Sequence, residues 1–186
     1  MSDSSPNKWF KLEEAFFHGV DEQLLQNLRR ENELKDRAEA IRRITGLTDD
    51  KVAAAIAALD ISVESLAAIR LIPLVAVAWA DDRVDENESF RILKAAENAQ
   101  IIEGEPSYEL LKRWLGTRPP ADLLDTWVEY AKSLAVSLDG ESKTNLRKSV
   151  TAQAKAVASA SGGVLGVGSI SPSEKAVLER IEAALS

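Results

Sequence analysis

Residues 70–81 read RLIPLVAVAWAD, and this stretch decides the class of fold. From Pro73 to Ala80 every side chain is apolar, so a helix here is apolar on all of its faces. Such a helix is stable in water only when other elements surround it. Pro73 lacks a backbone donor and disfavours helical backbone at Ile72, so it fits best as the first residue of the helix. We therefore predict a helix from Pro73 to Ala80 at the centre of a bundle.

The composition of the whole chain is typical of an all-α protein. The chain has 186 residues, of which 45% are hydrophobic, enough for one core in one domain or in one domain with an extension. It has only nine glycines and six prolines, and no run alternates β-branched or aromatic residues with polar ones. We predict an all-α bundle of about eight to ten helices.

The residues before the central helix are expected to be helical too. An apolar stripe begins at Trp9, and we expect Gly19 to break it before a second helix that covers residues 21–45. A third helix should begin with Thr48 as its N-cap and close near Asp60. We assign residues 1–60 to an N-terminal helical extension.

Five further helices are expected after the central one. The first should run from Asp85 to Ile102 with Ile102 on its buried face, and Gly140 should end the helix whose stripe is Leu123 to Leu138. The other three are expected at residues 106–116, 142–161 and 171–185. The four tryptophans lie on these stripes or on that of the N-terminal region, so we interpret them as core residues.

Several classes of function are excluded or disfavoured. The chain has no cysteine, which excludes disulfides and thiolate chemistry, and its single histidine, His18, leaves no histidine pair for zinc. We expect His18 at the surface or its boundary. The glycines of SGGVLGVGS (residues 161–169) lack the Lys-Ser/Thr of a P-loop, so we interpret them as a tight connector. We therefore predict a non-enzymatic protein, with an unknown hydrolase as the weakest alternative.

Charge and hydropathy disfavour nucleic acid as a partner and a membrane as the location of the chain. The net charge is −7, and nine acids against three bases at residues 81–109 account for −6 of it. This charge disfavours nucleic acid, which attracts clustered Lys and Arg. The longest apolar run, Leu71 to Ala80, is about half of the roughly 20 residues that a transmembrane helix needs, and the first ten residues lack the basic start and apolar stretch of a signal peptide. We expect a cytoplasmic protein without a transmembrane segment.

An acidic turn follows the central helix. Four carboxylates there are candidate ligands for a divalent cation such as Ca²⁺, which takes several oxygen ligands: Asp81, Asp82, Asp85 and Glu88. The spacing does not fit an EF-hand loop, because Glu86 stands where that loop needs Gly. The other interpretation, which we favour, is that Asp85 and Glu88 form a capping box and the remaining acids are solvated.

The same arrangement recurs near the C-terminus. The segment VDENESFRIL (84–93) aligns with ISPSEKAVLE (170–179), where Ser171 takes the place of Asp85 and Glu174 that of Glu88. A capping residue followed three positions later by Glu predicts a helix start in both places. We therefore predict two related helical halves.

The stretch VAVAWADDRVDENE resembles the signature of the TerB-like tellurite-resistance family. In that signature an apolar helix is followed by Ala-Asp-Gly, an aliphatic residue and a Glu, and here Asp82 takes the position of the Gly. The resemblance covers about residues 66–186, and we assign residues 61–186 to a TerB-like domain. It implies an all-α fold of two related halves, a role in stress or resistance networks, and no known catalytic residues.

Two functions remain open at this stage. The first is a non-enzymatic TerB-like module that acts through protein partners in a stress or tellurite-resistance context, with or without a cation site at the acidic turn. The second is a helical adaptor unrelated to tellurite, whose acidic face binds a basic partner.

Overall fold

Every regular element of the described chain is a helix. The structure, a computed structural model, describes residues 6–160 and 170–186, with side chains from Glu22 onward. Its elements are α1 (Pro6–Thr45), α2 (Asp50–Ala58), the 3-10 helix η1 (Leu66–Leu71), α3 (Ile72–Ala78), α4 (Glu86–Asn98), α5 (Pro106–Gly116), α6 (Leu123–Ser137), α7 (Gly140–Ala158) and α8 (Pro172–Ala184). The predicted all-α bundle is confirmed.

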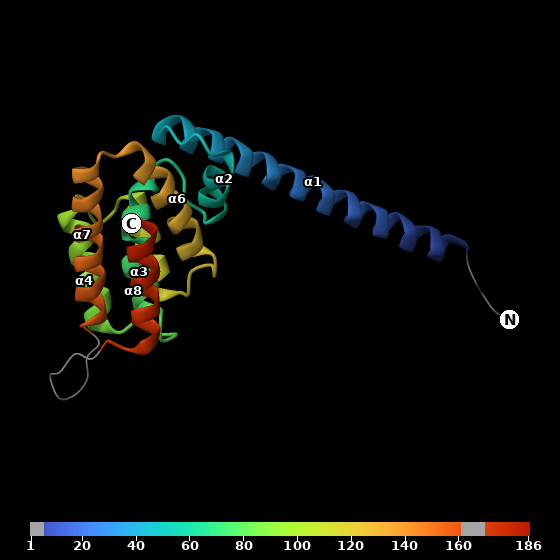
Figure 1. Ribbon diagram of the computed structural model, residues 1–186. Helices are drawn as coiled ribbons and strands as arrows, with labels where there is room; N and C mark the ends of the chain where they lie inside the picture. Colours follow the sequence, from blue (N-terminus) through green and yellow to red (C-terminus); the bar gives the residue numbers. More distant parts are fainter. Residues whose placement is uncertain (1–5, 161–169) are drawn as a thin grey trace.

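Helix α3 lies at the centre of the bundle, as its sequence predicted. It packs against α4, α6, α7, α8 and η1, and all of its residues except Ala76 are buried (Figure 1). The helix begins at Ile72, one residue before the predicted start, and Ile72 has helical backbone angles. Pro73 is tolerated there because the first N–H groups of a helix have no intrahelical acceptor.

Helix α1 is continuous for 40 residues, so the predicted break at Gly19 is wrong. Glycine costs about 1 kcal/mol inside a helix but does not end one. Only the C-terminal part of α1 packs on α2, where Ile41 is fully buried and Leu34 and Ala38 are partly buried. The rest projects away from the bundle as an arm (Figure 1).

Helix α2 contributes to the same core as the later helices. Val52, Ala53 and Ile56 are buried in it, and α2 packs on α6 as well as on α1. Asp49, not Thr48, is the N-cap, because its side chain accepts a hydrogen bond from the Lys51 amide at 2.8 Å. The division between residues 1–60 and 61–186 stays a prediction.

Two predicted helix ends are wrong. Helix α4 stops at Asn98, Gln100 takes a φ of +63°, and Ile101 is then buried while Ile102 is exposed. Gly140 does not end α6. It is the first residue of α7, whose N-cap is Asp139. Helices α5 and α8 have their predicted bounds to within one residue.

The central position of α3 leads to a test of stability. Replacing Ile72 with Ala should lower the free energy of unfolding by about 2–5 kcal/mol, because the cavity cannot collapse when packed helices surround it. Val136→Ala, at a position 88% exposed on α6, is the control and should change it by less than about 0.5 kcal/mol. Urea denaturation measures both. If both variants change the free energy of unfolding by the same small amount, α3 is not enclosed.

Candidate functional site: an acidic turn and a groove

The acidic turn between α3 and α4 is tied to α5 and the residues after it. Asp82 has a φ of +70°, a left-handed conformation that favours glycine, and its carboxylate pairs with Arg118. The Arg118 guanidinium also lies 6.0 Å from the centre of the Trp79 ring. The Trp79 indole in turn donates a hydrogen bond to the Trp114 carbonyl at 2.7 Å. These contacts fix the path of the turn.

Both predicted capping boxes are confirmed. The Glu88 amide donates to Asp85 Oδ1 at 2.8 Å, and the Asp85 amide donates to Glu88 Oε2 at 2.9 Å. At the start of α8, the Ser171 amide donates to Glu174 Oε2 at 2.6 Å and the Glu174 amide to Ser171 Oγ at 3.2 Å. The two glutamates are 3% and 4% exposed. They are therefore interior groups, not solvated acids.

The buried position of Glu88 changes the pKa of its carboxyl group. Its pKa is raised to about 7, chiefly by burial and also by the nearby carboxylates of Asp85, Asp81 and Glu174, while the hydrogen bond from the Asp85 amide lowers it. The influence of Glu174 on this pKa shows that the starts of α4 and α8 are close in space. The two capping boxes therefore lie near each other.

The structure does not assemble the four predicted ligands into a metal site. Asp82 pairs with Arg118, and the side chains of Asp85 and Glu88 accept backbone hydrogen bonds. The Asp81 carboxylate lies 4.0 Å from Arg83 Nε. Within the part of the chain that is described, no three His, Cys, Asp or Glu side chains are placed to hold a metal ion. The cation site stays a prediction.

Two other sequence interpretations are not tested. The His18 side chain and the glycine-rich residues 161–169 lie outside the described part of the chain.

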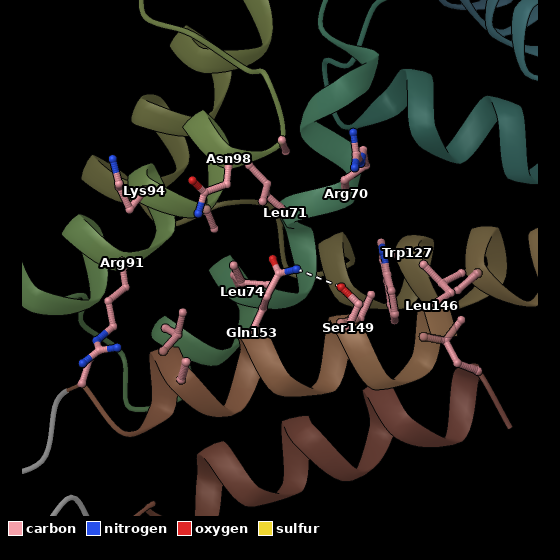
Figure 2. A pocket seen from close by; sticks show the side chains of 18 of the residues that line it. Arg70, Leu71, Leu74, Arg91, Lys94, Asn98, Trp127, Leu146, Ser149 and Gln153 are labelled. Carbon is pink, nitrogen blue, oxygen red and sulfur yellow. Dashed lines mark hydrogen bonds between the residues drawn. The ribbon is translucent and has the colours of Figure 1, made fainter. Parts of the chain in front are cut away.

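A groove of about 1160 Å³ lies between α4 and α7. Its walls come from α4 and α7, and η1, α3 and α6 line its depth, as Figure 2 shows. The residues that line it are Arg70, Leu71, Leu74, Asn87, Phe90, Arg91, Lys94, Ala95, Asn98, Ala99, Trp127, Tyr130, Ala131, Leu134, Leu146, Ser149, Val150, Gln153, Ala156, Val157, Ala160 and Leu185.

The charge of the groove is opposite to that of the chain. Arg70, Arg91 and Lys94 line it, and none of the described side chains along it is a carboxylate, in a protein of net charge −7. Arg70 lies near Tyr130: burial raises the pKa of this phenol, and the guanidinium opposes that rise. On α7, the Gln153 amide donates to Ser149 Oγ at 3.1 Å (Figure 2).

Sequence reasoning missed this groove, although α4 carries a signal for it. Asn87, Arg91, Lys94 and Asn98 are spaced four, three and four residues apart, which places them in a row along one side of the helix. Such a row also fits a solvated face. Only the packing of α7 alongside α4 turns it into the wall of a groove.

Comparison with known proteins neither supports nor refutes the resemblance to the TerB-like family. Neither a protein-family model nor a curated protein or solved structure matches the chain. None of the described helices combines the length and the apolar character needed to cross a membrane.

The raised pKa of Glu88 predicts how stability depends on pH. Between pH 4.5 and about 7 the folded chain retains a proton on Glu88 that the unfolded chain has lost, so raising the pH favours unfolding. The free energy of unfolding should fall by up to about 1.4 kcal/mol per pH unit in this window. Glu88→Gln keeps the capping acceptor without a charge and should remove this contribution.

The matched control is Glu86→Gln, in the exposed first turn of the same helix. It should retain the pH dependence of the unmodified protein. Urea denaturation across the window measures all three proteins, and an equal slope for Glu88→Gln would contradict the assignment.

The cation prediction is tested by thermal unfolding with Ca²⁺, Mg²⁺, Mn²⁺ or Zn²⁺ against a chelator at constant ionic strength. We expect no rise specific to a divalent ion, because three of the four carboxylates already have partners. Saturating binding at 100 times Kd would stabilise the fold by about 2.7 kcal/mol. A rise of that size, lost when Asp81 and Asp82 are both changed to Asn, would establish a metal site.

Proposed function

We propose that the chain is a non-enzymatic, cytoplasmic TerB-like module in a stress or tellurite-resistance context. It acts by binding a ligand and by protein contacts. Support for the family resemblance comes from the turn itself. Asp82 stands where the family has Gly, and its φ of +70° is a conformation that Gly adopts without strain. The paired capping boxes at the starts of α4 and α8 also fit two related halves.

The observation that carries a binding function is the groove between α4 and α7. A volume of about 1160 Å³ is slightly larger than that of most ligand sites, which are usually about 300–1,000 Å³. Apolar residues form most of its lining, and a small number of polar groups lie among them, as in sites that bind organic ligands. The described residues bring no nucleophile and base together there, so binding explains the groove better than catalysis.

A neutral fluorescent dye such as Nile red tests whether the groove binds ligands at all. The dye should bind with a stoichiometry of one, and Ala156→Trp should weaken binding at least about tenfold, because a ring at this exposed lining position fills the groove. Ala152→Trp is the matched control, since Ala152 is an exposed alanine on the same helix outside the groove. Absence of binding, or equal binding by both variants, would contradict the proposal.

Protein contact is the second part of the proposal, and the arm of α1 supports it. Leu24, Leu25 and Leu28 are each about half exposed, although they are large and apolar. An isolated helix is only marginally stable in water, so a second helix against these leucines would stabilise the arm. We propose the arm of a second copy. In an antiparallel pair, Glu22 of one arm lies near Arg29 of the other, which favours that orientation.

Light scattering after size-exclusion chromatography measures this pairing. The unmodified chain should form a dimer, and Leu24→Glu combined with Leu28→Glu should yield a monomer, because four added charges would face one another. Gln23→Glu with Gln26→Glu is the control, since these positions lie on the opposite side of the helix and add the same charge. A monomeric unmodified chain would contradict the pairing.

A further inference from the structure

We infer that the groove binds a single-chain anionic amphiphile, such as a long-chain carboxylate, with its head at Arg91 and Lys94 on α4 and its chain along the apolar depth of the groove. This inference rests on the proposed binding function of the groove and adds the chemical class of the ligand. Three observations support it: the cations that line the groove, its apolar depth, and its shape.

The cations are available to an anion. Among the described residues, Arg91 and Arg70 form no ion pair, while Lys94 pairs with Glu97 at 2.7 Å on the exposed side of α4. Exposed pairs of this kind contribute only about 0–1 kcal/mol, so Lys94 can exchange its partner for a ligand. Arg91 and Lys94 are three residues apart on α4 and both line the groove, and Figure 2 shows their side chains extending from that helix.

The depth of the groove is suited to a hydrocarbon chain. Leu71, Leu74 and Val157 form its buried floor, and the half-buried Leu134, Leu146 and Val150 leave apolar surface open above them. A charged or strongly polar ligand would lose its hydration there without compensation. A small inorganic anion would contact the arginines but leave this apolar lining unused. An amphiphile contacts the cations with its head and the apolar lining with its chain.

The shape of the groove favours a narrow ligand over a partner helix. Helices α4 and α7 pack against each other, and a third helix of about 10–12 Å in diameter would have to separate them. The lining residues of α7 extend from Leu146 to Val157, which corresponds to about 17 Å along a helix. A long, thin chain fits this length without moving either wall.

Isothermal titration of the full chain with decanoate and dodecanoate, below their micelle concentrations, tests the inference. Each added methylene group contributes about 0.8 kcal/mol, so dodecanoate should bind about 15-fold more tightly than decanoate. Dodecyltrimethylammonium has the same chain with a positive head and should bind at least about tenfold more weakly than dodecanoate.

Variants locate the head group. Arg91→Gln should weaken dodecanoate binding about tenfold and leave Nile red binding unchanged, because the dye is neutral. Arg83→Gln is the matched control, since Arg83 is a highly exposed arginine outside the groove, and it should bind dodecanoate as the unmodified chain does.

Three results would overturn the inference. Equal affinity for dodecanoate and dodecyltrimethylammonium would show that the groove does not select an anionic head group. Unchanged dodecanoate binding by Arg91→Gln would show that the head group does not lie at Arg91. Binding to phosphatidylglycerol vesicles without binding of free dodecanoate would point to a membrane surface instead. In each case, Nile red binding that Ala156→Trp abolishes would leave the proposed binding function standing, whereas loss of that signal would refute both.

Discussion

The structure depends on one constraint, which is that α3 is apolar around its whole circumference and must be covered on every side. Burying a side chain of this kind contributes about 1.5–3 kcal/mol, so the free energy gained by enclosing the helix is large. Each of α4, α6, α7, α8 and η1 meets α3 with part of an apolar face. The groove lies where two of these covering helices, α4 and α7, flank η1 and α3, so its position follows from the same constraint.

Two interior carboxyl groups place a second constraint on the bundle. Glu88 and Glu174 are buried at the starts of α4 and α8, and each is retained by its capping box. For Glu88 the hydrogen bonds do not offset the loss of solvation, which is why its pKa is raised to about 7. The acidic turn therefore costs stability at neutral pH. Asp82 adds backbone strain at a φ of +70°, and its pairing with Arg118 restrains the same turn.

The sequence predicted those features that local chemistry determines. Pro106 and Gly116 bound α5, the Ser171 box starts α8, and the apolar run of α3 fixes its central position, because each depends on residues close in the chain. The continuation of α1 through Gly19 was missed because a single glycine only weakens a helix. The groove was beyond local reasoning, since its lining comes from five elements that meet only after folding.

Hydrogen exchange at individual amides tests the account most directly, because it ranks the elements by how much of the structure must open to expose them. If enclosure of α3 holds the bundle together, the amides of Val77, Ala78 and Trp79 should exchange only on global unfolding. Their protection should equal the free energy of unfolding measured with urea. Exchange of these amides at a rate similar to that of the exposed residues of α4 would contradict the account.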